Sequence, residues 1–174
     1  LEPLHFNTPD TPTVSVIIPA QNHIAATYSP LCSLLLSHNE AEYEVIVIDD
    51  ASDDETARLE DIVQGVTVFR NDTPQRFIRA CNRGAEEAKG KYIALLNNDT
   101  EVTSGWLDEL IAAFSTFDNA GLVGSKLLFP DGRLQDAGGL VWGSGTPWNY
   151  GRGENPKDPR FSYARHAEYL SGAA

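Results

Sequence analysis

Apolar runs rich in β-branched residues alternate with helix-like segments over residues 14–117. Runs that are apolar along nearly their whole length are typical of strands buried on both faces, and helices between such strands are typical of parallel sheets. The expected fold is therefore α/β, with a mostly parallel sheet covered by helices on both faces. The expected strands span residues 14–18, 44–48, 66–69 and 91–96, and the expected helices span residues 28–37, 53–63, 74–89 and 104–117.

The pattern changes after the last of these helices. A further short strand is expected at residues 122–124, and Asp131-Gly132 predicts a hairpin turn between two short β-like runs. Residues 138–159 are rich in Gly, Pro and Trp and show no periodicity, which predicts a long loop. Residues 169–174 are mostly small or apolar and predict the start of another strand.

The domain boundaries follow from the same pattern. Residues 1–12 hold three of the ten prolines and predict an extended lead-in, whereas residues 13–174 are expected to form one domain. The chain opens at Leu1 instead of a methionine and stops within an expected strand. We therefore expect it to be a piece of a longer protein, truncated at its C-terminus.

The charge of the chain limits its partners. Lys and Arg number 13 against 25 Asp and Glu, which gives a net charge of −12. Such a field repels nucleic acids and anionic membranes, and a phosphorylated substrate would need a cation as a bridge. Cys32 and Cys81 both fall in expected helices, so a reducing compartment fits better than a disulfide framework. No apolar run is long enough to cross a membrane, and the expected location is the cytoplasm or the cytoplasmic face of a membrane.

A polar cluster follows each of the first four expected strands. The clusters are Gln21-Asn22, Asp49-Asp50, Asn71-Asp72 and Asn97-Asn98-Asp99. In open α/β sheets, ligands bind outside the carboxyl ends of the strands, although Asn and Asp also serve as ordinary turn residues. The Gly-rich fingerprints of dinucleotide-binding and P-loop proteins are both missing. Oxygen ligands around Asp99 suit a hard cation such as Mg²⁺ or Mn²⁺.

These motifs, in this order, resemble the inverting family 2 glycosyltransferases of the GT-A fold. The first two family signatures match residues 14–22, Val-Ser-Val-Ile-Ile-Pro-Ala-Gln-Asn, and residues 47–54, Val-Ile-Asp-Asp-Ala-Ser-Asp-Asp. The family's Asp-x-Asp metal motif is reduced here to Asn97-Asn98-Asp99. A further signature matches Asn71, Phe77, Asn82, Gly84, Gly90 and Tyr92. Residues 131–139 resemble the rhamnosyltransferase-like branch, and the whole resemblance covers about residues 13–140.

The resemblance implies a role for each matching residue. Asp49 would accept the imide N–H of uracil or thymine, and the main chain at Pro19-Ala20 would hold the nucleoside. Asp99 would hold Mn²⁺ or Mg²⁺ against the diphosphate, with Asn97 as a weak or outer ligand. The implied nucleotide-sugar site comprises Pro19, Ala20, Asn22, Asp49, Asp50, Arg79, Asn97 and Asn98, with Asp99 as the metal ligand.

The implied reaction is the transfer of a sugar from a UDP- or dTDP-sugar to a hydroxyl of a carbohydrate or lipid-linked acceptor, with inversion and metal assistance. The family's general base lies in a Glu-Asp motif that no residue up to Ala174 matches, so this chain is expected to be the N-terminal, donor-binding part of a transferase. A catalytically inert nucleotide-sugar-binding or scaffolding module is the alternative. A sugar-nucleotide synthesising enzyme is disfavoured, because no Gly-rich basic loop follows the first strand.

Three other features have two readings each. Arg76, Arg79 and Arg83 form a basic stripe that is either a phosphate contact or a solvated helix face. His23 is more simply a surface residue than a nucleoside contact. The pair Trp142 and Trp148 either stacks on an acceptor sugar or anchors its own loop.

Overall fold

The computed structural model describes residues 1–173, which fold as two units that are described separately below. The first unit comprises residues 1–109 and Ala173, and the second spans residues 110–172, with helix α3 crossing the boundary. The strands and helices of the first unit are β1 (Leu4–His5), β2 (Val14–Ala20), α1 (Ile24–Leu36), β3 (Tyr43–Asp49), the 3₁₀ helix η1 (Glu55–Asp61), β4 (Val63–Gln64), β5 (Thr67–Arg70), α2 (Arg76–Glu87), β6 (Tyr92–Leu95) and the start of α3 (Trp106–Thr116).

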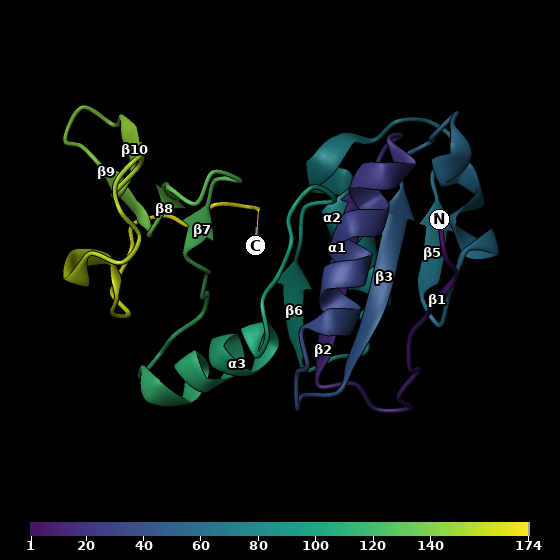
Figure 1. The fold of residues 1–174 in the computed structure, drawn as a ribbon, viewed down its shortest axis with the longest axis horizontal. Helices are drawn as coiled ribbons and strands as arrows, with labels where there is room; N and C mark the ends of the chain where they lie inside the picture. The colour runs from purple at the N-terminus through teal and green to yellow at the C-terminus, as the bar shows by residue number, and fades with distance from the viewer. Residues whose placement is uncertain (174) are drawn as a thin grey trace. The chain divides into compact units, whose positions relative to one another are not determined.

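A four-stranded parallel sheet forms the centre of the first unit, in the order β5-β3-β2-β6 (Figure 1). Helix α2 covers one face, where Ala80 packs against Ile17, Ile46 and Ile48. Neighbouring side chains of a strand point to opposite faces, so Val16 and its equivalents face the other side, over which α1 lies (Figure 1). The α/β fold with helices on both faces of a parallel sheet is thus confirmed.

Helix α2 approaches the sheet closely because Gly84 faces it. A side chain at Gly84 would place its Cβ 2.5 Å from Cγ2 of Ile17, a distance that forces one of the two to move. The expected helix at residues 74–89 is therefore confirmed in kind, although it is shorter than expected. Of the helix expected at residues 53–63, only Glu55–Asp61 are helical, as the 3₁₀ helix η1 with non-helical backbone angles at Arg58, and Val63 already belongs to β4.

The second unit contains two antiparallel hairpins. Strands β7 (Leu127–Leu128) and β8 (Leu134–Asp136) flank the expected turn at Asp131-Gly132, where Gly132 has a φ of +82°. Strands β9 (Gly139–Val141) and β10 (Pro147–Asn149) pair within the segment expected to be a long loop, so that expectation is wrong in part. A short 3₁₀ helix, η2 (Pro159–Phe161), follows.

Two expected strands near the end of the chain are absent from the described residues. Residues 122–124 do not join a ladder with any described strand, and Leu122 is 74% exposed. From residue 169 onward, only Tyr169 forms a bridge, to Gly139, while Ala174 lies outside the described residues. A strand needs a neighbour to take its backbone hydrogen bonds, and local sequence does not reveal whether one exists. At the other end, residues 1–12 contain β1, which pairs with β4. No helix among the described residues is long and apolar enough to cross a membrane.

Asp136 of β8 is an unusual buried carboxyl group. The residue is 2% exposed, and neither carboxylate oxygen has a hydrogen-bond partner among residues 1–173. Burial raises the pKa of Asp136, and the neighbouring Gly138 amide and the charge of Arg152 offset only part of that rise. Because the carboxyl group holds its proton more tightly in the folded state, stability is full at acidic pH and falls as pH rises through the raised pKa.

We expect Asp136→Asn to be more stable than the unchanged chain at pH 7.5, by about 1 kcal/mol or more, or about 2–4 °C in melting temperature. The amide carries no charge, so the difference should shrink as pH falls toward about 4. Thermal melts between pH 4 and 8 measure this. The exposed carboxylate of Asp118 provides the control, and Asp118→Asn should follow the unchanged chain at every pH. Equal slopes for Asp136→Asn and the unchanged chain would contradict the prediction.

Candidate functional site

The polar clusters of the first unit meet at the carboxyl edge of the sheet. Strand β2 comes first along the sheet-forming part of the chain, β3 and β5 follow on one side of it, and β6 lies on its other side. The direction of winding therefore changes between β2 and β6, and ligands of open α/β sheets bind at such a point. The segments at this edge are residues 21–23, 49–54, 71–72 and 96–99.

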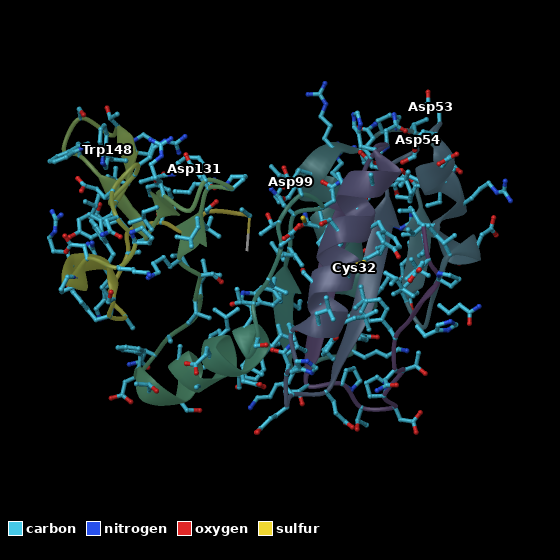
Figure 2. The ribbon with its side chains drawn as sticks, viewed as in Figure 1. Cys32, Asp53, Asp54, Asp99, Asp131 and Trp148 are labelled. Atoms are coloured by element: carbon cyan, nitrogen blue, oxygen red, sulfur yellow. The ribbon has the colours of Figure 1, made fainter. Side chains whose placement is uncertain are left out.

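Two of these segments are joined by hydrogen bonds between backbone and side chains. The Asn22 amide donates to the Ser52 hydroxyl at 2.8 Å, and the Asp53 amide donates to Oδ1 of Asn22 at 2.9 Å. The His23 amide donates to Oδ2 of Asp54 at 2.6 Å. Figure 2 labels Asp53 and Asp54 at this junction. The loops after β2 and β3 are thus held in one arrangement, and His23 itself is exposed, as expected.

The backbone at this junction is left-handed at three residues that are not glycine. Asn22, His23 and Ala51 have φ values of 57°, 58° and 62°. Asn tolerates this region better than most residues, whereas alanine has no side chain to compensate the cost of about 1–2 kcal/mol. Ala51 lies between the two carboxylates and Ser52, so its strain is located in the site itself.

We expect Ala51→Gly to raise stability by about 0.5–1 kcal/mol, or about 2–4 °C in melting temperature, because glycine adopts a positive φ without a steric penalty. Thermal denaturation measures this shift. Ala57 in η1 is exposed and lies outside the left-handed region, so Ala57→Gly should give no gain. A melting temperature for Ala51→Gly at or below that of the unchanged chain would show that the loop carries no such strain.

Asp49 ends β3 and is buried, with 2% of its surface exposed. Its Oδ1 accepts a hydrogen bond from the Ser52 amide at 2.8 Å, and its Oδ2 lies 2.7 Å from Nη1 of Arg70. Arg70 ends β5, directly opposite Asp49 in the strand register, and also donates to the Ser52 carbonyl. Each carboxylate oxygen keeps one lone pair for a further donor.

Asp50 caps the first turn of α2. Its Oδ1 accepts hydrogen bonds from Nδ2 of Asn71 and from the Gln75 amide, each at 2.7 Å, and its Oδ2 accepts one from the Arg76 amide at 2.7 Å. Burial alone would raise the pKa of Asp50, but these hydrogen bonds outweigh it and lower the pKa below its usual value. Asp50 therefore stays ionised at neutral pH and fixes α2 against the end of β3.

The three arginines of the expected basic stripe have different environments. Arg83 donates to the Arg70 carbonyl at 2.8 Å and to Oδ1 of Asn71, and it lies over the ring of Phe69 at 5.5 Å. Arg79 is exposed and donates to Oε1 of Gln75 at 3.0 Å, while Arg76 is exposed at the start of α2. Arg83 thus supports the end of β5, and Arg76 and Arg79 face solvent.

The segment after β6 supplies the expected metal ligand. Asp99 is exposed, as Figure 2 shows, and Nδ2 of Asn98 donates to the buried Thr27 hydroxyl at 3.2 Å. The Asn97 amide donates to the Ala173 carbonyl at 2.9 Å. The described residues contain no group of three or more His, Cys, Asp or Glu side chains suited to a metal. One accessible carboxylate fits the usual Mg²⁺ arrangement, in which substrate phosphates and water supply the remaining ligands.

The remaining expected contacts lie where β2 ends. Pro19 pairs with Ile48 and Ala20 pairs with Asp49 in the strand register, and the Ala20 carbonyl accepts from the Asp50 amide at 2.8 Å. The main chain here is therefore tied to the main chain of both aspartates. Arg70 was missed by the sequence analysis, because its pairing with Asp49 depends on the register between β3 and β5.

Comparison with protein-family models identifies the family of the chain. The family model described as Glycosyl transferase family 2 matches residues 15–166. The chain belongs to this family. The resemblance deduced from the sequence is thereby confirmed at the level of the family.

Curated relatives support the assignment. The chain is 35% identical over 135 residues to the O-antigen biosynthesis protein RfbC of Myxococcus xanthus, covering 75% of this chain and 10% of that protein. It is 32% identical over 137 residues to the uncharacterized protein y4gI of Sinorhizobium fredii, covering 75% of this chain and 15% of that protein. The chain thus spans only a small part of the length of these relatives.

Solved structures confirm the fold. TarS 1–349 of S. aureus in complex with UDP-GlcNAc superposes with a TM-score of 0.52 at 19% identity, over 64% of this chain and 37% of that one. The mannosyltransferase PcManGT of Pyrobaculum calidifontis, in complex with GDP-Man and Mn²⁺, gives a TM-score of 0.52 at 19% identity, over 70% of this chain and 37% of that one. At this identity the likeness shows a GT-A glycosyltransferase fold and not a substrate.

Proposed function

We propose that the carboxyl edge of the sheet binds the nucleotide of a UDP- or dTDP-sugar. The proposal rests above all on the match to glycosyl transferase family 2 over residues 15–166, which includes every segment of this edge. Two of the solved relatives are complexes with UDP-GlcNAc and GDP-Man, so nucleotide sugars are the ligands of this fold elsewhere. The proposed function of the protein is inverting transfer of the sugar to a hydroxyl of a carbohydrate or lipid-linked acceptor.

Each residue of the edge has a proposed part in donor binding. Asp49 accepts the imide N–H of the base through a remaining lone pair, while Arg70 and the Ser52 amide hold the carboxylate in place. Pro19 and Ala20 present main chain to the nucleoside, and Asn22 and Asp50 keep the surrounding loops fixed through their hydrogen bonds. Arg79 offers an exposed cation to the phosphates. The segment 97–99 borders the diphosphate.

A divalent cation, Mn²⁺ or Mg²⁺, completes the proposed site through Asp99. When bound, it supplies positive charge that stabilises the leaving diphosphate. Asp99 would hold it with one carboxylate, and the Asn97 amide oxygen would add no charge to the site. A cation is also the means by which a chain of net charge −12 could attract a nucleoside diphosphate.

We expect UDP to bind more tightly with Mn²⁺ than in EDTA, and Asp99→Asn to remove that difference without lowering the melting temperature, because Asp99 is exposed. Titration calorimetry with and without the metal measures this. Glu87→Gln provides the control and should keep the difference. Glu87 is also exposed, and it lies at the last residue of α2, at the opposite end from the turn that Asp50 caps. Tight and equal binding of UDP in EDTA would overturn the role of the metal.

We place the protein in the rhamnosyltransferase-like branch on the strength of residues 131–139, and we assign the general base to residues outside 1–174. Within these residues, the proposed task of the chain is to bind and orient the donor.

A further inference from the structure

The hairpin of the second unit is built to present one face. Strands β9 and β10 pair Leu140 with Trp148 and Gly139 with Asn149. The Trp142 amide donates to the Thr146 carbonyl at 3.0 Å, and the Gly145 amide donates to the Trp142 carbonyl at 2.7 Å, which closes a three-residue loop. Gly145 has a φ of +80°, as the last residue of such a loop requires.

The two tryptophans lie on the same face of this hairpin. Side chains opposite each other in the ladder share a face, as do residues two apart in one strand, so Leu140, Trp142, Thr146 and Trp148 project together. The other face carries Gly139 and Asn149, where the hydroxyl of Tyr169 donates to Oδ1 of Asn149 at 2.6 Å. One face is therefore occupied within the unit, and the tryptophan face is separate from it.

The tryptophan side chains do not anchor the hairpin. Trp142 is 57% exposed and Trp148 is 55% exposed, whereas Trp106 in α3 is 8% exposed. Figure 2 labels Trp148 on the hairpin formed by β9 and β10. Apolar side chains that gather on one exposed face mark interaction sites more often than single exposed residues do. Of the two interpretations that the sequence left open, anchoring is therefore the weaker one.

The hairpin that carries the two rings is polar and has no charged side chain of its own, and the charged group bonded to it is the Glu168 carboxylate, which accepts a hydrogen bond from the Val141 amide. Residues 137–151 contain no Asp, Glu, Lys, Arg or His, although the chain as a whole has a net charge of −12. At the tip, the hydroxyl groups of Ser144 and Thr146 lie 3.0 Å apart. A flat aromatic surface beside hydroxyl groups, in an uncharged stretch of an acidic protein, suits a neutral ligand that has both an apolar face and hydroxyl groups.

We propose that Trp142 and Trp148 form a binding platform for the neutral pyranose rings of the acceptor glycan. The C–H groups on one face of a pyranose pack on an indole ring, while its hydroxyl groups remain free for Ser144, Thr146 and water. This inference rests on the proposed glycosyl transfer, because a transferase needs an acceptor. It names that acceptor as an oligosaccharide without charged groups at the residues that contact the hairpin.

The test uses ligand-observed NMR and tryptophan fluorescence on the 174-residue chain. The probes are neutral oligosaccharides of glucose, mannose, galactose or rhamnose units, with oligogalacturonate as the charged comparison. We expect at least one neutral probe to bind and to shift the fluorescence, and oligogalacturonate to bind more weakly. Trp142→Ala and Trp148→Ala should each weaken binding by about tenfold or more. Trp148→Phe, which keeps an aromatic ring, should retain most of it.

Tyr163→Ala is the matched control, because Tyr163 is another aromatic residue of the same unit and is 64% exposed. It should leave oligosaccharide binding unchanged. Absence of binding by every neutral probe would overturn the platform. It would also be overturned if the two tryptophan-to-alanine variants bound oligosaccharide as tightly as the unchanged chain. A third outcome is that the unchanged chain binds no sugar but self-associates, and that the tryptophan variants lose this self-association. The tryptophan face would then be assigned to a second copy of the chain, and the platform would be overturned.

Calorimetry with UDP on the same preparation separates this inference from the proposed function. Binding of UDP without binding of any oligosaccharide contradicts the platform and leaves donor binding intact. Binding of a neutral oligosaccharide, lost in the tryptophan variants, supports the platform even if UDP fails to bind, and in that case the donor site is what has been misassigned.

Discussion

Asp49→Asn should bind UDP at least about tenfold more weakly than the unchanged chain and should lose most of its preference for UDP over CDP. A carboxylate only accepts, so it pairs with the imide N–H of uracil, which cytosine lacks. The amide of asparagine can turn its own donor toward the base and accommodate either. Loss of a charge-assisted hydrogen bond costs about 1.5–3 kcal/mol, and about 1.4 kcal/mol is a factor of ten in affinity. Calorimetric titration of both variants with both nucleotides measures the ratio.

Arg70→Gln separates base recognition from the ion pair. Arg70 lies 2.7 Å from Asp49 and is half exposed, so its removal leaves the carboxylate present but without its counter-charge. If Asp49→Asn acted only by breaking the ion pair, Arg70→Gln would reproduce its effect on the UDP-to-CDP ratio. We expect Arg70→Gln to keep the preference for UDP. Asp53→Asn, at an exposed site in the same loop, should change neither affinity. Equal binding of UDP and CDP to the unchanged chain would refute the assignment of Asp49.

The first unit could be predicted from the sequence because its strands are buried on both faces. The runs that became β2 and β3 are apolar along their length, and burial of Ile17, Ile46 and Ile48 matches that pattern directly. The polar clusters that follow the strands could also be placed at one edge, since parallel strands share their carboxyl ends. The apolar run was sufficient to predict these strands, because the run itself is what causes their burial.

The hydrogen bonds of the site could not be predicted in the same way. The pairing of Asp49 with Arg70 depends on the register between β3 and β5, and the capping of α2 by Asp50 depends on where that helix starts. The 3₁₀ helix η1 carries the sequence of a capped α-helix, with Asp54 accepting from the Thr56 amide at 2.8 Å. In each case the outcome depends on residues distant in sequence or on the geometry of a neighbouring loop.

The second unit shows the limits of periodicity most clearly. Gly139–Asn149 has the composition of a loop, yet the left-handed Gly145 allows a tight turn and the flanking residues pair as strands. The expected strand at residues 122–124 has the composition of a strand and forms none with the described residues. Strand formation depends on a partner and a turn, and short strands carry little signal of their own.

Residues 1–174 alone should show no sugar transfer at a useful rate, even with donor bound. An inverting reaction needs a base that takes the proton of the acceptor hydroxyl as the oxygen attacks, and positioned proton transfer contributes about 10²–10⁴-fold. Asp49 is paired with Arg70 and assigned to the nucleobase, and Asp50 caps the start of α2, so we assign neither to that task. We therefore expect transfer to be lower by at least about a hundredfold than in a version of the protein extended beyond position 174. Release of UDP and formation of the glycosylated acceptor, measured with a panel of UDP- and dTDP-sugars, test this.

Donor hydrolysis is the matched measurement, because it requires the bound donor and no acceptor. Slow hydrolysis that needs Mn²⁺ and Asp99, without transfer, would agree with a chain that binds and orients the donor alone. Robust transfer by residues 1–174 would contradict the assignment of the base outside them. The candidates would then be Asp136, Glu154 and Asp158. Glu154 and Asp158 lie 3.6 and 3.0 Å from Arg160, whereas burial raises the pKa of Asp136. The variants Asp136→Asn, Glu154→Gln and Asp158→Asn would then show which of the three carboxylates the transfer needs.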